Sequence, residues 1–258
     1  MSSALVLYTL KAALRDKLVR VVLVLFVLIA ALSLFMGGTA VLEQKSFSLV
    51  FAASSIRLAA VLGAILFVSF YIQRSYASKD IDFLLSRPIS RGAFVASQGL
   101  AFLIISVLMG VAAFLTIFAL SGGQLTMGLC YWAIGLMVEI ALIANVAMFF
   151  SMVLSSSVAS VAASFGFYIL SRMTGAIFGI VDSGQMGGIF KFFEGIVQAV
   201  TLILPRLDLI VQTSWLVYGT DGVGGASAVS IPYLIVVGVV FCLFVILATV
   251  IDLKRKEF

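Results

Sequence analysis

The sequence has very few charged residues. Only 10% of its 258 residues are charged, whereas 63% are hydrophobic, and the mean hydropathy is +1.26. A soluble domain carries roughly 25% charged residues, so this chain has too few polar side chains to cover a surface that faces water. In lipid the backbone must satisfy its own hydrogen bonds within helices or a closed barrel. The apolar stretches run to about twenty residues without the alternation of a membrane barrel. The sequence therefore predicts an all-α integral membrane protein.

Several residue types that support chemistry are missing or scarce. Histidine is absent, which removes the commonest general base and metal ligand, so no catalytic or metal site is expected. The two cysteines, Cys130 and Cys242, lie in apolar stretches and are expected to be buried hydrophobes rather than a disulfide. The chain has no G-x-x-x-x-G-K-[ST] phosphate loop and is not expected to bind a cofactor itself. Its basic residues form short clusters at the ends of apolar stretches, which does not favour nucleic-acid binding.

Six apolar stretches are long enough to cross a membrane as helices. They cover about residues 21–37, 56–72, 99–120, 127–153, 158–180 and 231–251. No internal repeat or second folded domain interrupts them, so residues 1–258 are expected to form a single membrane domain.

Two further segments are expected to lie at the membrane surface. In residues 2–20, leucines follow helical spacing and basic residues lie elsewhere on the cylinder, which is typical of an interfacial amphipathic helix. The alternative is a solvated start to the first span. Residues 188–204 are apolar but contain Lys191 and Glu194 and end at Pro205. They are expected to form an external helix that lies on the outer leaflet or dips into it.

The basic residues predict the orientation, because cytoplasmic loops carry an excess of Lys and Arg. An N-terminus inside the cell places eleven of them in the cytoplasm: Lys11, Arg15, Lys17, Arg20, Arg74, Lys79, Arg87, Arg91, Lys254, Arg255 and Lys256. Four lie outside (Lys45, Arg57, Lys191 and Arg206), and Arg172 lies inside a span. Both termini are therefore expected to be cytoplasmic.

The loop between the second and third spans carries the most informative pattern. Ser78 can cap a short helix, and Asp80 and Asp82 suit its positive end. Three apolar residues, Ile81, Leu84 and Leu85, share one face of this helix. Pro88 ends it, and Ser90 is placed to cap the next helix. Such a helix either docks in a groove of a partner or lies on the membrane surface.

This loop resembles the signature loop of the type-two ATP-binding-cassette (ABC) exporter permeases. The residues that carry the resemblance are Lys79, Ile81, Asp82, Leu84, Leu85, Ser86, Pro88, Ile89, Ser90 and Arg91. Members of that family have six spans, cytoplasmic termini, an interfacial N-terminal helix and a partly embedded external region before the last span, all of which match the expectations above.

The resemblance implies a permease subunit without enzymatic activity of its own. It would pair with a second copy or a close relative and with two cytoplasmic ABC ATPase subunits, which bind ATP and Mg²⁺, and members in bacteria lie in the cytoplasmic membrane. In the family the loop helix receives the movement of the ATPase. That role falls here on Asp80, Ile81, Asp82, Phe83, Leu84, Leu85, Ser86, Pro88, Ser90 and Arg91.

Two charged residues are expected deep in the membrane. Glu139 lies fourteen residues from Val153 in the fourth predicted span, and Arg172 lies fourteen from Val158 in the fifth. Both therefore stand about 21 Å from the cytoplasmic ends of adjacent helices. An unpaired charge at that depth costs about 2.5–3.5 kcal/mol on insertion scales. The two residues are expected either to form a structural ion pair or to line a substrate path.

Two other functional classes remain open at this point. An ion-coupled carrier or channel would use Glu139 and Arg172, but it typically shows paired discontinuous helices in two halves, which this sequence lacks. A non-transporting membrane scaffold would use the amphipathic loop only to recruit a partner.

Overall fold

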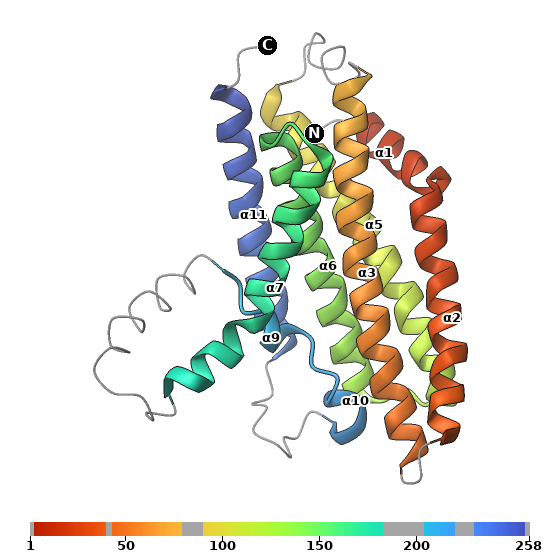
Figure 1. Ribbon diagram of the computed structural model, residues 1–258. Coiled ribbons are helices and arrows are strands. Elements are labelled where there is room, and N and C mark those ends of the chain that lie inside the picture. The colour runs from red at the N-terminus through yellow and green to blue at the C-terminus, as the bar shows by residue number, and fades with distance from the viewer. Residues whose placement is uncertain (1–2, 40–42, 79–89, 183–203, 220–229, 256–258) are drawn as a thin grey trace.

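The computed structural model describes residues 3–39, 43–78, 90–182, 204–219 and 230–255. All regular structure in these ranges is helical (Figure 1). The helices are α1 (Ser3–Arg15), α2 (Lys17–Thr39), α3 (Gln44–Ala77), α5 (Arg91–Leu120), α6 (Met127–Val153), α7 (Ser157–Asp182), α9 (Leu207–Ile210), α10 (Trp215–Tyr218) and α11 (Ile231–Arg255). The long helices lie side by side in one bundle, and α1 begins and α11 ends at the same end of it (Figure 1).

Five helices are long and apolar enough to cross a membrane: α2, α3, α5, α6 and α11. The predicted all-helical, membrane-spanning character is therefore confirmed. The helix α7 is not among these five, which were found in the described residues alone. It follows α6 through a short turn, runs antiparallel to it and bends away from the bundle towards its C-terminal end (Figure 1). The six-span layout stays a prediction.

The helix bounds differ from the predicted spans mainly at α3 and α5. The helix α6 has the predicted bounds 127–153, and α2, α7 and α11 extend the predicted stretches by a few residues. In contrast, α3 covers 44–77 instead of 56–72, and α5 begins at residue 91 instead of 99. An apolar stretch marks only the apolar part of a helix. The helix can extend further through polar residues at either end, because their backbone groups form the same helical hydrogen bonds. As a consequence Arg57, predicted at the outer end of its span, lies well inside α3 rather than near the start of the helix.

The predicted amphipathic helix of residues 2–20 is divided at Asp16. The carboxylate of Asp16 accepts a hydrogen bond from the backbone N–H of Leu18 at 2.8 Å, which caps the first turn of α2. In α1 the buried face consists of Leu5, Val6, Thr9 and Ala13. Leu7 and Leu14, predicted to share one apolar face, are both exposed. The helix therefore packs on the protein with one face and leaves a second apolar face uncovered.

The helix α6 forms the centre of the bundle. In its most apolar stretch 72% of the residues are buried, against 22% in α2 and 28% in α11. Its neighbours approach closely at glycines: a Cβ atom added at Gly110 of α5 would overlap the side chain of Met137, and one added at Gly238 of α11 would overlap that of Val138. Small residues of this kind allow close helix packing in a membrane.

Residues 204–219 pack into the bundle against α3, α6 and α7. Their buried side chains are Leu204, Leu207, Ile210, Val211 and Trp215. On α6, a Cβ atom added at Gly128 would overlap the carbonyl oxygen of Trp215, and one added at Gly135 would overlap that of Ile210. The two glycines are seven residues apart and therefore share one helical face. The predicted external helix at 188–204 lies outside the described residues, apart from Leu204.

Candidate functional site

The predicted ATPase-coupling residues lie mostly outside the described ranges. This holds for Asp80, Ile81, Asp82, Phe83, Leu84, Leu85, Ser86 and Pro88, so their arrangement stays a prediction. Ser90 caps α5, since its side chain accepts a hydrogen bond from the backbone N–H of Ala93 at 3.2 Å. Arg91 donates to the carbonyl of Leu253 at 2.8 Å. This hydrogen bond connects the start of α5 to the end of α11.

Glu139 and Arg172 are brought together between α6 and α7. The Nη1 atom of Arg172 lies 3.7 Å from Oε1 of Glu139. The carboxylate of Glu139 is fully buried, and neither of its oxygens accepts a hydrogen bond from the described residues. The charge of Glu139 is therefore balanced by the nearby Arg172 rather than by hydrogen-bond donors. Removing that cation is expected to destabilise the protein.

Arg172 is held by the backbone of the inserted segment 204–219. Its Nη1 donates to the carbonyl oxygen of Leu207 at 2.6 Å, and its Nη2 donates to that of Val211 at 2.8 Å. Leu207 is the first residue of the four-residue helix α9, and Val211 directly follows its last residue. The guanidinium thus links α7 to both ends of α9.

Three more polar residues join this site. Arg57 of α3 donates to the same carbonyl of Val211 at 3.4 Å. The phenol of Tyr168, one turn before Arg172, is within electrostatic reach of Arg57, Glu139 and Arg172. Asp208 interacts with Arg172 and forms an ion pair with Arg206 at 3.0 Å. The site therefore joins α3, α6, α7 and the inserted segment through both signs of charge.

The close approach of the inserted segment depends on a third glycine. A Cβ atom added at Gly175 of α7 would overlap a carboxylate oxygen of Asp208. Gly175 belongs to a small-x-x-x-small pattern with Gly179, which is typical of close helix packing. In the structure the space at Gly175 is taken by the side chain of Asp208. We call Arg57, Glu139, Arg172 and Asp208, with the carbonyls of Leu207 and Val211, the arginine cluster.

The geometry of the arginine cluster is that of a structural contact between helices. Its arginines bind backbone carbonyls of this chain, and the nearby side chains of Ile56, Ile140 and Leu207 are fully buried. Within the described ranges no group of three or more His, Cys, Asp or Glu residues could hold a metal ion.

A second polar contact fastens α1 to the bundle. Thr9 is fully buried, and its hydroxyl lies 3.0 Å from Oε1 of Gln98 and 3.2 Å from the hydroxyl of Tyr71. Gln73 of α3 donates to the carbonyls of Ser151 and Leu154 at the end of α6. These contacts hold α1, α3, α5 and α6 together at the end of the bundle where α3 ends and α5 begins.

Comparison of the sequence with models of known protein families finds no match, and comparison with curated proteins finds none.

Proposed function

We propose that this chain is the membrane-spanning permease subunit of an ATP-driven ABC exporter. In this proposal two copies, or one copy and a close relative, pair in the bacterial cytoplasmic membrane with both termini in the cytoplasm. Two separate ATPase subunits bind ATP and Mg²⁺ and move the loop helix at residues 79–91. The chain does not hydrolyse ATP itself.

The sequence of that loop, with its apolar face and its capping residues, carries the proposal. Its position in the fold supports it. The loop connects α3 and α5, which have 34 and 30 residues. At 1.5 Å per residue these helices are about 51 and 45 Å long, well over the hydrocarbon thickness of about 30 Å. Rigid helices of this length can transmit a displacement from the loop into the membrane.

The alternative functions receive less support from the arginine cluster. An ion-coupled carrier would need Glu139 and Arg172 to face a path for ions, whereas Arg172 is occupied by the carbonyls of Leu207 and Val211. A non-transporting scaffold would use the same loop to recruit a partner, and the experiment below separates it from an exporter.

The test combines copurification with a charge placed on the loop. The chain is purified in mild detergent from the cells in which it is naturally made, and copurifying ABC ATPases are sought. Copurification and stimulated ATP turnover support an exporter, whereas the absence of an ATPase partner contradicts it and favours the alternatives. Leu84→Asp is expected to weaken association about tenfold or more, because a carboxylate on an apolar docking face loses hydration without gaining a partner.

A matched control variant is Leu125→Asp. Leu125 is 68% exposed in the turn between α5 and α6, at the opposite end of the bundle. The control is expected to leave ATPase association unchanged. Equal association of the Leu84→Asp and wild-type chains would contradict the coupling role of the loop.

A further inference from the structure

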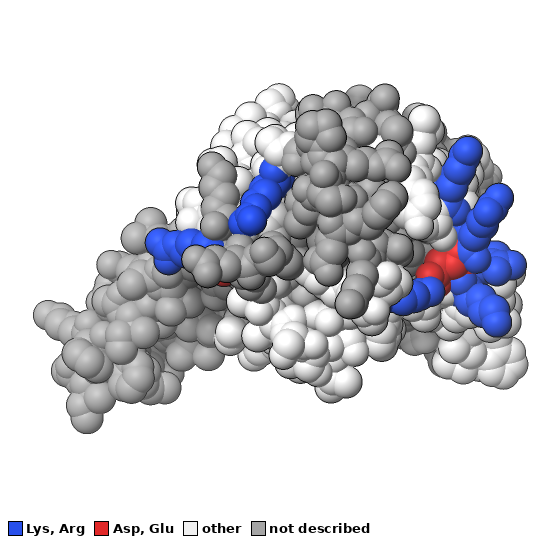
Figure 2. All heavy atoms as spheres, turned by 90° about the horizontal axis from the view of Figure 1, so that it is seen from above, with Lys and Arg blue, Asp and Glu red and all other residues white. Residues whose placement is uncertain are grey.

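The corner between α1 and α2 forms a basic pocket beside α3 and the start of α7. Nine residues line it: Arg15, Asp16, Lys17, Leu18, Phe70, Gln73, Arg74, Ala77 and Ser157. Viewed onto this end of the molecule, Lys and Arg side chains gather around a small acidic area over the same corner (Figure 2). The lining contains three cations and one carboxylate, so its formal charge is positive.

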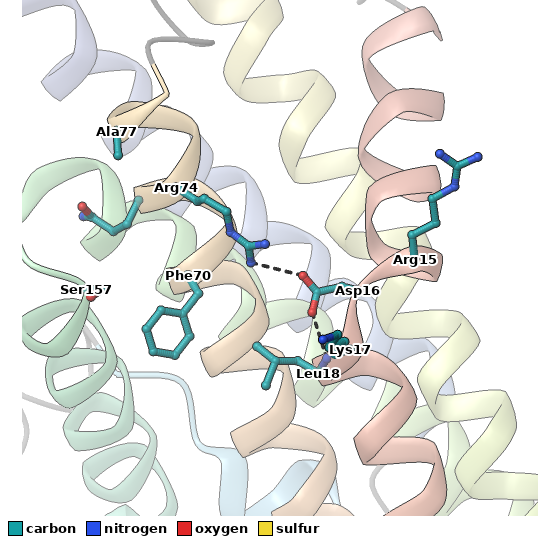
Figure 3. A pocket seen from close by; sticks show the side chains of 9 residues that line it. Arg15, Asp16, Lys17, Leu18, Phe70, Arg74, Ala77 and Ser157 are labelled. Atoms are coloured by element: carbon teal, nitrogen blue, oxygen red, sulfur yellow. Dashed lines mark hydrogen bonds and ion pairs between the residues drawn. The ribbon is translucent and has the colours of Figure 1, made fainter.

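The single carboxylate of the pocket is already engaged. Asp16 lies 3.2 Å from Nη2 of Arg74 and accepts from the N–H of Leu18 (Figure 3). Arg74 is 66% exposed, and in the described structure its guanidinium uses one of five N–H groups for this pair. Its remaining donors and the ammonium of Lys17 favour a second anion. No other acid lines the pocket.

Two helices begin at this pocket. Lys17 is the first residue of α2 and Ser157 the first of α7, and neither helix has an acidic residue in its first turn. The backbone N–H groups of a first helical turn have no partner within the helix and carry partial positive charge. They add to the field of the three cations. An anion in the pocket is therefore favoured by the basic side chains and by the start of α7, whereas the first turn of α2 is already capped by Asp16.

Two large apolar side chains also line the pocket. Phe70 and Leu18 lie on the side of the pocket nearer the middle of the bundle, with the Arg74–Asp16 pair above them (Figure 3). Just beyond the pocket, Val21 of α2 and Val158 of α7 are 60% and 73% exposed. A ligand with an anionic head and apolar chains can bind the cations and cover this surface. Free inorganic phosphate would leave the apolar side uncovered.

We propose that this pocket binds the headgroup of an anionic phospholipid, with the acyl chains lying along α2, α3 and α7. The lipid joins α1 to α3 and the start of α7, and it holds the α1–α2 corner at the membrane surface. This inference does not depend on the exporter function.

The test measures lipid retention by native mass spectrometry of the full-length chain in detergent. Phosphatidylglycerol and phosphatidylcholine with identical acyl chains are added in equal amounts, and preferential retention of phosphatidylglycerol is expected. Each basic residue near an anionic surface contributes about fivefold in affinity. The Lys17→Gln/Arg74→Gln double variant is therefore expected to bind phosphatidylglycerol about 25-fold more weakly.

Three controls make the result specific. Lys45→Gln removes an exposed cation at the opposite end of the bundle and is expected to leave retention unchanged. Lys17→Arg keeps the positive charge, so its retention of phosphatidylglycerol is expected to stay near that of the wild type. If the double variant does not fold, comparing lipid retention by Lys17→Arg and by Lys17→Gln tests the role of the charge. An excess of inorganic phosphate is expected to displace little lipid. Equal retention by Lys17→Gln and Lys17→Arg, an equal loss in Lys45→Gln, or complete displacement by inorganic phosphate would overturn the proposal.

Discussion

Replacing Arg172 by methionine should destabilise the protein far more than replacing Glu139 by glutamine. Arg172→Met leaves the fully buried carboxylate of Glu139 without the cation 3.7 Å away, and it removes the hydrogen bonds that Arg172 donates to the carbonyls of Leu207 and Val211. Breaking a buried pair by removing one partner costs about 3–5 kcal/mol. Glu139→Gln keeps the shape of the side chain and both carbonyl contacts of Arg172, so its cost is expected to be about 1–2 kcal/mol.

The double variant gives the decisive comparison. With Glu139→Gln in place, Arg172→Met no longer leaves a charge uncompensated in the bundle. The double variant is therefore expected to be more stable than Arg172→Met alone, with a coupling free energy of about 1–3 kcal/mol. Unfolding in mixed micelles of sodium dodecyl sulfate and a mild detergent gives the free energies. Tryptophan fluorescence can follow it, because both tryptophans, Trp132 and Trp215, are buried.

Additive effects of the two substitutions would refute this reasoning, as would a double variant no more stable than Arg172→Met. A loss of transport in Glu139→Gln at unchanged stability would instead show that Glu139 lines the path of the substrate.

Two further variants test how segments are attached to the bundle. Gly135→Ala is expected to destabilise the protein by about 1–3 kcal/mol and to raise quenching of Trp215 by acrylamide, because the new Cβ would overlap the carbonyl of Ile210. Gly166→Ala is its control, since no atom lies within 4 Å of the added Cβ, and a quenching change equal to that of Gly135→Ala would contradict the close approach. Thr9→Val is expected to loosen α1 at a cost of about 1–3 kcal/mol, since the buried oxygen of Gln98 loses its partner. Thr116→Val, whose hydroxyl bonds only to the carbonyl of Ala112 within its own helix, is expected to change the unfolding free energy less, and equal effects would argue against the anchor.

The sequence was sufficient to predict a contact between two residues that lie at the same height on neighbouring helices. Glu139 and Arg172 were expected at the same height because each lies fourteen residues from the end of its predicted span, and the structure brings them together. The bounds of α6 follow from an apolar stretch between Thr126 and the serine-rich turn, and they agree with the structure. Local composition was sufficient for both.

The rest of the arginine cluster depends on contacts that local composition does not encode. Arg57 was expected near the start of its helix, because the apolar stretch that marked the span begins twelve residues after α3 does. The carbonyls of Leu207 and Val211 carry no sequence signal, since every residue has one. One signal was available: Gly128, Gly135 and Glu139 recur on one face of α6, which indicates a face that receives backbone closely.

The insertion of residues 204–219 also bears on how the protein is made. The segment docks on α3, α6 and α7, so it reaches its place only after all three have been synthesised. Until then Arg172 lacks the two carbonyls that later hold it, and Glu139, which precedes it in the chain, is the counter-ion already in place. Among the contacts that Arg172 makes in the arginine cluster, Glu139 is therefore the first to become available. In a chain whose synthesis stops before residue 204, Arg172 would lack the carbonyls of Leu207 and Val211 and would have Glu139 as its counter-ion.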